Sequence, residues 1–472
     1  MRNIYNHSAL LLLSLFALTA CQHDSLISIS NFSHNEMIHY PVPLLRGTLP
    51  IQADSITLLN KTTGQKVHGL IHHGKFILLP ELVPGKNKLE LRSGTERRMI
   101  TLTYKPNTNS YRLKIFYVTD NTGITDYETP QIDDPQNFVA KISTGFKLLQ
   151  TFIADDFNRK GLPRKTFNLE FDQNGELIIH KITSSKSRKW FHENPSFKWY
   201  GEIVSLMGKT KHPKDKILKI AFVNVTNFDK EQGKVVGDVS LNSKYGALFG
   251  SGSLYTWPDN LQDVFRAFSD SASINPSAQC DNSYNRWTHG AMASTSLGEI
   301  LHEIGHGTGL PNSTLNMSIM GNGYNYFSRS FTHVEAPEKS QETTLEFQTG
   351  DLPFWSSAYA DILWHDHFFN PEKKKPQKKN LPAIHLNDAK DSVLIATEYG
   401  IRGMILYNFN NGNLQFREED ATIYKDSKPQ RIALAVKNIQ KQVNNPLFTV
   451  LAYDEFGNKN SLHVWSEQML QP

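Results

Sequence analysis

Two histidines and a glutamate in the second half of the sequence have the residue types and the spacing that bind a metal ion. His302, Glu303 and His306 form the pattern H-E-x-x-H. On a helix, His302 and His306 stand one turn apart on the same face, so both imidazoles can reach one cation. Zinc suits two imidazoles and one further protein ligand, with the fourth position left to water. Glu303 would then move a proton between that water and a leaving amine. The pattern therefore predicts one zinc ion per chain and hydrolytic chemistry.

The residues after this pattern favour a metal site over a helix that merely carries two surface histidines. A chance H-E-x-x-H in a chain of this length is expected at about a few per cent. Gly309 follows His306 by three residues, and a left-handed turn at the end of a helix needs glycine. The chain can then turn back so that position 312 approaches the metal, which makes Asn312 the candidate third ligand.

The helix that carries the pattern is expected over residues 294–307. An apolar stripe on a separate face would anchor it in a core, and this stripe consists of Leu297, Ile300, Leu301 and Ile304. Ser296 and Glu299 fit a capping box near its start, although the helix could begin earlier.

The surrounding region, residues 110–370, mixes strands and helices. Residues 217–225 form a near-continuous apolar run, which predicts a central strand of a sheet. Apolar residues recur at helical spacing over 137–158. Residues 246–250 are either the edge strand on which a peptide substrate lies or an ordinary loop, and we give the two equal weight. A further strand and a further helix are expected at 111–119 and 261–268.

Short strands broken by turns flank this region on both sides. Such segments over residues 33–106 predict a small β-sandwich, and those over 381–472 predict a second one. Residues 371–380 are rich in lysine and proline, which predicts an extended basic linker. The fold class that we expect is therefore α+β and multidomain. A length of 472 residues fits roughly two to four domains.

The N-terminus has the pattern of a targeting segment. Residues 1–20 carry a positive charge and then an apolar run of signal-peptide length. Residues 18–21, Leu-Thr-Ala-Cys, resemble a bacterial lipobox, in which the cysteine is lipidated and becomes the first residue of the mature chain. Gln22 follows, and the lack of an aspartate there goes with the outer membrane in lipoproteins of Gram-negative bacteria. We therefore expect a lipoprotein signal peptide, a membrane anchor at Cys21, a tether over 21–32 and an extracytoplasmic location.

The composition excludes several classes of protein. Hydrophobic residues make up 39% of the chain, which excludes a wholly disordered protein. The net charge of +4, from 50 Lys+Arg against 46 Asp+Glu, is too small to argue for nucleic acid as a partner. Two cysteines, Cys21 and Cys280, exclude a disulfide-stapled fold. With Cys21 lipidated, Cys280 is expected to be a buried small hydrophobic residue rather than a reactive group.

The stretch 302–312 resembles the extended signature H-E-x-x-H-x-x-G-x-x-H/D of the metzincin zinc peptidases, written here with Asn at the last position. More narrowly, the chain resembles a zinc metallopeptidase family found in fungi and bacteria, over about residues 33–370. The stretches that carry this resemblance are 84–87, 250–258, Trp287, 302–312, 318–320, Tyr324 and 327–331.

The resemblance implies a metzincin-like zincin fold for the middle region and a role for each matching residue. His302 and His306 would be zinc ligands, and Glu303 would be the general base. Met320 would be the methionine of the Met-turn, which lies under the histidines without binding the metal. Tyr324 would stabilise the oxyanion, although a tyrosine near a turn is more often structural.

Asn312 departs from the family pattern, which has His or Asp at this position. A neutral amide oxygen is a poor zinc ligand compared with imidazole or carboxylate. Three outcomes are open: Asn312 binds zinc weakly or through water, another residue replaces it, or the site has decayed. The candidates for replacement are His333, Glu335, His365 and His367. The last two could instead form a separate metal pair or a structural helix end.

Two functions from different classes follow from these observations. The first is a lipid-anchored zinc metalloendopeptidase that hydrolyses extracytoplasmic proteins or glycoproteins, with cell-wall peptides as a further substrate class. The second, motivated by Asn312, is a catalytically decayed peptidase scaffold that binds glycans or proteins as a surface lipoprotein.

Overall fold

The computed structural model describes residues 25–208, 217–243, 246–277, 279–337, 345–370, 380–410 and 413–464. The predicted signal peptide over 1–20 and the predicted lipidation site Cys21 lie outside the described residues, as do residues 371–379 of the predicted linker. Within the described ranges, no helix has the length and apolar character needed to span a membrane.

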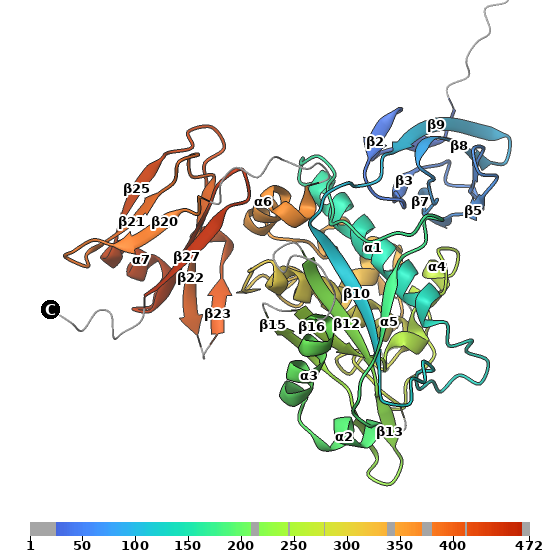
Figure 1. Ribbon diagram of the computed structural model, residues 1–472. Helices are drawn as coiled ribbons and strands as arrows, with labels where there is room; N and C mark the ends of the chain where they lie inside the picture. Colours follow the sequence, from blue (N-terminus) through green and yellow to red (C-terminus); the bar gives the residue numbers. More distant parts are fainter. Residues whose placement is uncertain are drawn as a thin grey trace, which may run out of the picture.

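A five-stranded sheet forms the centre of the middle region (Figure 1). Its strands, in spatial order, are β11 (Ile179–Thr183), β10 (Arg112–Thr119), β12 (Ile217–Asn224), β16 (Gly246–Gly250) and β15 (Ser240–Ser243). The first four strands are parallel, and β15 pairs antiparallel with β16. Strand β12 lies at the centre as predicted, because its apolar run is covered on both faces.

The sequence-based expectation of an edge strand at 246–250 is wrong. Strand β16 lies between β12 and β15, and all five of its residues are buried. The edge is β15, in which Ser240 is exposed and Leu241 and Asn242 are half-buried. A fully buried run is suited to an inner strand, whereas a polar strand can tolerate the solvent beside a sheet edge.

Helices cover both faces of this sheet. On one face lie α1 (Phe138–Arg159), the helix predicted from the apolar spacing over 137–158, and α5 (His289–Gly307). Asn137 caps the start of α1. On the other face lie α2 (Arg188–Glu193) and α3 (Ser196–Gly208), whose buried aromatic residues pack on the sheet. A short helix, α4 (Val264–Phe268), occupies part of the predicted segment 261–268 and contacts α5.

Helix α5 begins earlier than the expected start at 294. Thr288 is its N-cap and accepts a hydrogen bond from the backbone N–H of Ala291. The predicted capping box of Ser296 and Glu299 is wrong, because Ser296 lies inside the helix. The Ser296 hydroxyl donates to the carbonyl of Met292 at 2.7 Å and accepts from the Trp257 indole at 2.8 Å.

The N-terminal strands form two sheets around one apolar cluster. One sheet has the order β1 (Ser28–Ile29), β3 (Leu45–Thr48), β7 (Lys75–Leu78) and β6 (Leu70–His72). The other has the order β2 (Glu36–Ile38), β9 (Glu96–Tyr104), β8 (Gly85–Ser93), β4 (Thr57–Asn60) and β5 (Lys66–His68). The short strands expected over 33–106 are thus present, and the β-sandwich remains our interpretation of their packing.

Part of the predicted tether over 21–32 belongs to this folded region. Ser28 lies opposite Thr48 in the β1–β3 ladder, and Ile27 and Phe32 are buried in the apolar cluster. The tether prediction is therefore wrong from Ile27 onward, because these hydrophobic side chains find partners in strands that follow them in the chain.

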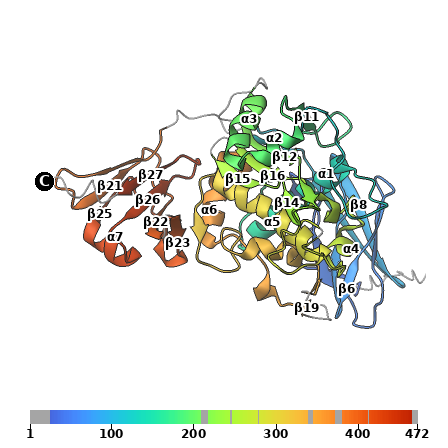
Figure 2. The same ribbon diagram turned by 90° about the horizontal axis from the view of Figure 1, so that it is seen from below.

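The C-terminal region also contains two sheets, which stand to one side of the middle region (Figures 1 and 2). The smaller sheet consists of β20 (Ala383–Leu386), β21 (Ser392–Ala396) and β25 (Arg431–Ala435). The larger has the order β17 (Asn312–Ser313), β23 (Asn413–Phe416), β22 (Gly403–Asn410), β26 (Phe448–Tyr453) and β27 (Lys459–Val464), with β24 (Ala421–Ile423) beside β22. Helix α7 (Val436–Val443) packs into the shared apolar cluster.

The three regions are joined by buried contacts. The main apolar cluster includes Leu79 from the N-terminal strands, Phe222 from β12 and Tyr407 from β22. Strand β17 belongs to the middle region in sequence and to the C-terminal sheet in space. The strand that follows the H-E-x-x-H helix therefore connects the middle region to the C-terminal sheet.

Candidate active site

Helix α5 ends in a turn that reverses the chain beside its last histidine. Gly309 has a φ of +87°, a conformation that favours glycine. The N–H of Leu310 donates to the carbonyl of Gly305 at 2.9 Å, and the N–H of Gly309 donates to the carbonyl of His306 at 2.8 Å. These two bonds form a Schellman motif, as the position of Gly309 predicted. The reversal brings the residues after Gly309 back toward His306.

Backbone carbonyls orient both histidines. His302 Nδ1 lies 2.8 Å from the carbonyl oxygen of Ile319, and His306 Nδ1 lies 2.8 Å from that of Leu310. Because a carbonyl only accepts, each Nδ1 must donate its proton, which leaves the Nε2 lone pair of each ring available to a metal. The two ring centroids are 4.6 Å apart. This donor set fits a zinc ion.

The environment keeps both imidazoles neutral. Burial lowers the pKa of His302 to about 4, and the neighbouring His306 lowers it further. Burial also lowers the pKa of His306, against the raising effects of its bonds to Leu310 and Asn312. Metal ligation requires neutral imidazole, so at neutral pH neither histidine has a proton to lose before it can bind zinc.

Glu303 has the properties of a proton acceptor. Burial raises the pKa of its carboxyl group, and the side chain of Asn242 lowers it. Glu303 Oε2 is buried and has no hydrogen-bond partner within the described residues. A raised pKa and an unsatisfied oxygen suit a carboxylate that takes a proton from water and later returns it.

The edge strand β15 is tied to helix α5 through the two glutamates of that helix. The Asn242 amide donates to the backbone carbonyl of Glu303 at 2.7 Å. Ser240 hydrogen-bonds the side chain of Glu299, whose pKa burial raises to about 7. The sequence analysis missed Ser240 and Asn242, whose two-residue spacing was the available signal because it places both on one side of a strand.

Met320 packs against α5 at Gly305, the residue before His306. It is fully buried, and a Cβ on Gly305 would lie 2.3 Å from its sulfur atom. Only glycine at position 305 permits this close approach. Met320 therefore packs on the helical turn that carries His302 and His306, and its role as the methionine of a Met-turn stays a prediction.

Tyr324 lies beside the first histidine. It belongs to the 3-10 segment Gly323–Ser330, and its ring centroid is 5.0 Å from that of His302. Its hydroxyl donates to the hydroxyl of Tyr284, which is an exposed residue with a φ of +56°. Burial raises the pKa of Tyr324, and Tyr284 raises it further, so this phenol stays protonated at neutral pH. The sequence analysis did not identify Tyr284.

Asn312 lies near the two histidines of α5, whereas the residues considered as replacements for it as third ligand lie elsewhere. The side chain of Asn312 lies close enough to His306 to raise the pKa of that imidazole. Glu335, in β18 (Val334–Glu335), instead forms ion pairs with Arg286 at 2.9 Å and Arg329 at 2.7 Å. These contacts leave Asn312 as the candidate third ligand that lies next to His306, itself a candidate zinc ligand.

The three histidines considered as replacement ligands, His333, His365 and His367, contact other parts of the molecule. The ring of His333 stacks on His72 of the N-terminal strands. His365 ends helix α6 (Ser357–His365), and its Nδ1 bonds the carbonyl of Glu455 at 2.9 Å. The ring of His367 stacks on that of Tyr111. For His365 and His367, the structural helix end is thus the interpretation that these contacts support.

Cys280, the cysteine within the described residues, has no disulfide partner there. Burial raises the pKa of its thiol well above the usual value, and the nearby Asp238 raises it further. This thiol is therefore not activated, as predicted, although the residue is half-buried rather than fully buried.

Comparison with known proteins gives a family match over most of the chain. Residues 26–401 match the model of a family described as the Putative peptidase family, Metallopep. A protein of Saccharomyces cerevisiae named a putative zinc metalloproteinase is 23% identical over 352 residues, which are 66% of this chain and 49% of the relative. A Schizosaccharomyces pombe protein with the same description is 23% identical over 400 residues, or 76% and 62% of the two chains. The chain thus spans about half to three-fifths of the length of these curated relatives.

A solved structure with a more distant likeness is OgpA from Akkermansia muciniphila. The wild-type crystal structure has a TM-score of 0.43 and 16% identity, covering 75% of this chain and 92% of OgpA. OgpA has also been solved, as a catalytically inactive form, in complex with an O-glycopeptide substrate, with a TM-score of 0.42. The O-glycopeptide is a substrate of OgpA, and the similarity between the two structures assigns no substrate to the present chain.

Proposed function

Because the chain belongs to the Putative peptidase family, whose model covers residues 26–401, we propose that it is a zinc-dependent metalloendopeptidase. The observation that carries this proposal is the tautomer of the two histidines on α5. His302 and His306 each donate Nδ1–H to a backbone carbonyl and so present Nε2 to one metal position. Zinc at this position would act as a Lewis acid on the scissile carbonyl and would acidify a water molecule.

The residues of the chain supply the proton transfers. Glu303, with its raised pKa and unpartnered Oε2, takes the proton from the attacking water and delivers it to the leaving amine. Tyr324 keeps its proton and lies next to His302. When the two hydroxyls exchange roles and Tyr284 donates to Tyr324, the Tyr324 proton is free to form a hydrogen bond with the oxyanion. Tyr284 holds the Tyr324 hydroxyl and acts as a positioning residue.

The sheet order supports a metzincin-like catalytic domain. Four parallel strands are followed by one antiparallel edge strand, β15, and this edge lies against the helix that bears H-E-x-x-H. A peptide that pairs with β15 would add a strand to the sheet and pass close to Glu303. Asn242 links that strand to the helix, so a peptide bound to β15 would have a fixed position relative to Glu303.

Asn312 is the proposed third ligand, through its amide oxygen or a bridging water. Its proximity to His306 and the reversal of the chain at Gly309 support this assignment. The neutral amide also motivates the second candidate function, a decayed scaffold that binds proteins or glycans. That alternative predicts a protein in which His302 and His306 hold no zinc.

The proposed site of action is outside the cytoplasm. Residues 18–21 support a lipid anchor at Cys21, and such an anchor would hold the enzyme on the outer membrane of a Gram-negative bacterium. Extracytoplasmic proteins or glycoproteins are then the substrates within reach.

Zinc content and chelator-sensitive cleavage test the proposed function. The protein is purified without added metal or chelator, and both zinc and cleavage of a panel of denatured proteins are measured. We expect zinc to be retained and cleavage to stop when the zinc is removed by a chelator. A protein that neither retains zinc after dialysis against it nor cleaves any member of the panel would instead support the binding scaffold.

A further inference from the structure

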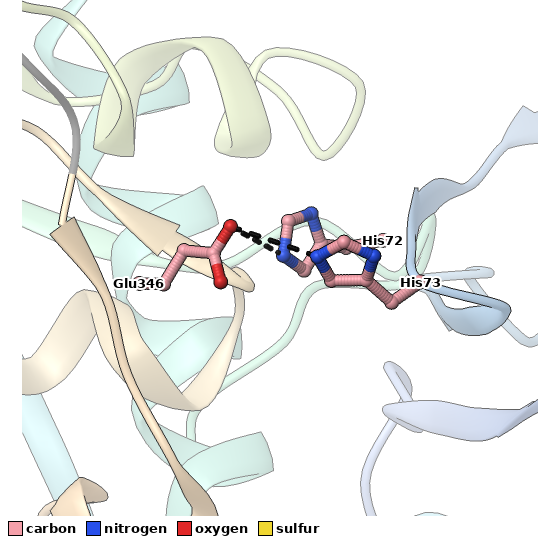
Figure 3. A group of neighbouring side chains, drawn as sticks. All are labelled: His72, His73 and Glu346. Atoms are coloured by element: carbon pink, nitrogen blue, oxygen red, sulfur yellow. Dashed lines mark ion pairs between the residues drawn. The ribbon is translucent and has the colours of Figure 1, made fainter.

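We propose that His72, His73 and Glu346 form a second divalent-cation site, suited to zinc, between the N-terminal sheets and the middle region. His72 ends β6, His73 follows it in the turn to β7, and Glu346 lies in β19 (Leu345–Glu346). Figure 3 shows both imidazole rings facing the carboxylate of Glu346. Glu346 follows His73 by 273 positions in sequence, so the fold and not a local motif brings it to the two adjacent histidines.

The distances match those between ligands of one zinc ion. His72 Nε2 lies 3.2 Å from Glu346 Oε1, and His73 Nε2 lies 3.7 Å from the same oxygen. Two ligand atoms bound to tetrahedral zinc at about 2.0–2.1 Å lie roughly 3.3 Å apart. One ligand atom from each residue lies within 4.8 Å of the others. A cation can therefore enter the group with small side-chain movements.

The β6–β7 turn aims the two histidines in one direction. His72 pairs with Lys75, so His73 and Gly74 form a two-residue turn with φ values of +48° and +71°. Positive φ at both positions defines a type I′ turn, in which asparagine or aspartate is the common first residue. Histidine at this position places its ring 4.1 Å from that of His72. The turn thus brings two imidazoles to one point at the tip of the hairpin.

Unsatisfied nitrogen atoms distinguish a metal site from a simple ion pair. His72 Nε2 is buried and has no hydrogen-bond partner in the described part of the chain, although the Glu346 carboxylate is next to it. His333 Nε2 is also buried without such a partner, and its ring stacks on His72 at 5.9 Å. Buried polar atoms are ordinarily satisfied, and a nitrogen lone pair beside an anionic oxygen is the arrangement of two ligands that share one cation.

The remainder of the site fits a small open metal centre. The side chains of His73 and Glu346 are 75% and 58% exposed, which leaves solvent access for a fourth ligand. One carboxylate and two imidazoles form a donor set that zinc accepts. Of the neighbouring cationic groups, Arg46 is already paired with Asp155 at 2.7 Å.

A cation here would brace the N-terminal hairpin against the catalytic region. Strand β19 pairs with β18, where Glu346 lies opposite Val334. The next residue, Glu335, binds Arg286, and Arg286 in turn donates to the backbone carbonyl of Asn325 at 2.6 Å. Asn325 directly follows Tyr324. The role that we assign to the second site is therefore structural, and it is independent of the proposed catalytic zinc.

Metal analysis of a protein without the catalytic ligands tests the proposal. The double variant His302→Ala/His306→Ala is dialysed against zinc and then against buffer, and bound zinc is measured by mass spectrometry. We expect about one zinc per chain and a rise in melting temperature on adding zinc. Adding His73→Ala and Glu346→Gln should abolish both effects. His68→Ala, at an exposed histidine of β5, is the matched control and should leave both unchanged.

The outcomes separate this proposal from the proposed function. Zinc retained by wild type but absent from the folded double variant, as judged by circular dichroism, would overturn the second site and leave the catalytic site intact. One zinc in both proteins would support the second site and count against catalytic zinc binding. Zinc that persists after His73→Ala and Glu346→Gln would overturn the assignment of these ligands. Both changes are at exposed side chains, so they are expected to leave folding intact.

Discussion

Asn312 lies opposite Gln415 in the parallel ladder between β17 and β23. The candidate third ligand of the catalytic metal therefore belongs to the sheet of the C-terminal region. The N–H of Thr314 extends this connection by donating to the carbonyl of Phe416 at 2.9 Å. The ring of Phe416 stacks on Tyr359 of α6, with centroids 4.6 Å apart. The C-terminal sheet thus helps to hold the chain that follows the H-E-x-x-H helix.

A first prediction tests whether this connection supports the metal site. The Tyr359 hydroxyl donates to the carbonyl of Pro311 at 2.9 Å, one residue before Asn312. Tyr359→Phe removes this bond and leaves a carbonyl unsatisfied, which should lower the free energy of unfolding by about 1–3 kcal/mol. We also expect zinc affinity, measured by competition with a chelating dye, to fall several-fold. Tyr399→Phe in the C-terminal region is the control, and equal affinities in both variants would exclude the proposed support.

A second prediction concerns Asn312 itself. Asn312→Asp provides a carboxylate, which is a stronger zinc ligand than an amide, and should tighten zinc binding by about tenfold or more. Asn312→Ala should weaken it, because the third protein ligand is lost. Equilibrium competition assays on the purified variants measure both changes. If neither substitution alters the zinc affinity, Asn312 does not contribute to the metal site.

The parts of the site that sequence predicted depend on local spacing. The i, i+4 relation of His302 and His306 holds on any α-helix, and Gly309 marks the end of that helix whatever surrounds it. The long apolar run of β12 likewise identifies a strand covered on both faces. Such patterns require no knowledge of what the segment packs against.

The parts that sequence did not predict depend on contacts between distant residues. The apolar composition of β16 favours an inner strand, but the sequence does not identify β15 as its outer neighbour, because pairing partners determine the order of a sheet. Ser296 and Thr288 both fit a helix cap, and the burial of Trp257 against Ser296 decides between them. The pairing of Asn312 with Gln415 and the approach of His73 to Glu346 join separate regions in the same way.

A third prediction follows from the carboxyl group of Glu299. Burial raises its pKa from the ordinary 4.5 to about 7, so between these values the folded protein holds a proton that the unfolded chain releases. Ionisation of Glu299 therefore costs folding free energy as the pH rises, with the full cost above about pH 7. Glu299→Gln removes this cost and should stabilise the metal-free protein by about 3 kcal/mol at roughly pH 8.5.

Urea unfolding in the presence of a chelator measures this effect, since bound zinc would itself shift the pKa of Glu299. Near pH 4.5 the variant and the wild type should be about equally stable, because the carboxyl group is then mostly protonated in the folded state. A stability difference that is the same at both pH values would contradict a raised pKa at this position. Glu231→Gln, at an exposed turn, serves as the control and should show no pH-dependent gain.

A fourth prediction concerns the oxyanion role proposed for Tyr324. Its hydroxyl is held by Tyr284, and its ring lies beside His302. Tyr324→Phe removes the donor without removing the ring, so kcat should fall by about tenfold to a hundredfold while zinc content and KM stay near those of the wild type. Tyr284→Phe should cause a smaller fall, because it frees the Tyr324 hydroxyl rather than deleting it. Equal kcat values in Tyr324→Phe and the wild type would exclude the oxyanion role and show that the tyrosine is structural.

The last prediction separates proton transfer from metal binding. Glu303→Gln keeps the shape of the side chain and removes its basicity, whereas the Nδ1 bonds of His302 and His306 to backbone carbonyls are untouched. The variant should therefore retain its zinc and lose cleavage by about 10²–10⁴-fold, the usual contribution of a positioned acid–base group. Zinc content and turnover of a denatured protein substrate are measured on one preparation. Unchanged turnover would exclude Glu303 as the general base, and loss of both zinc and turnover would show that its role is to support the metal site.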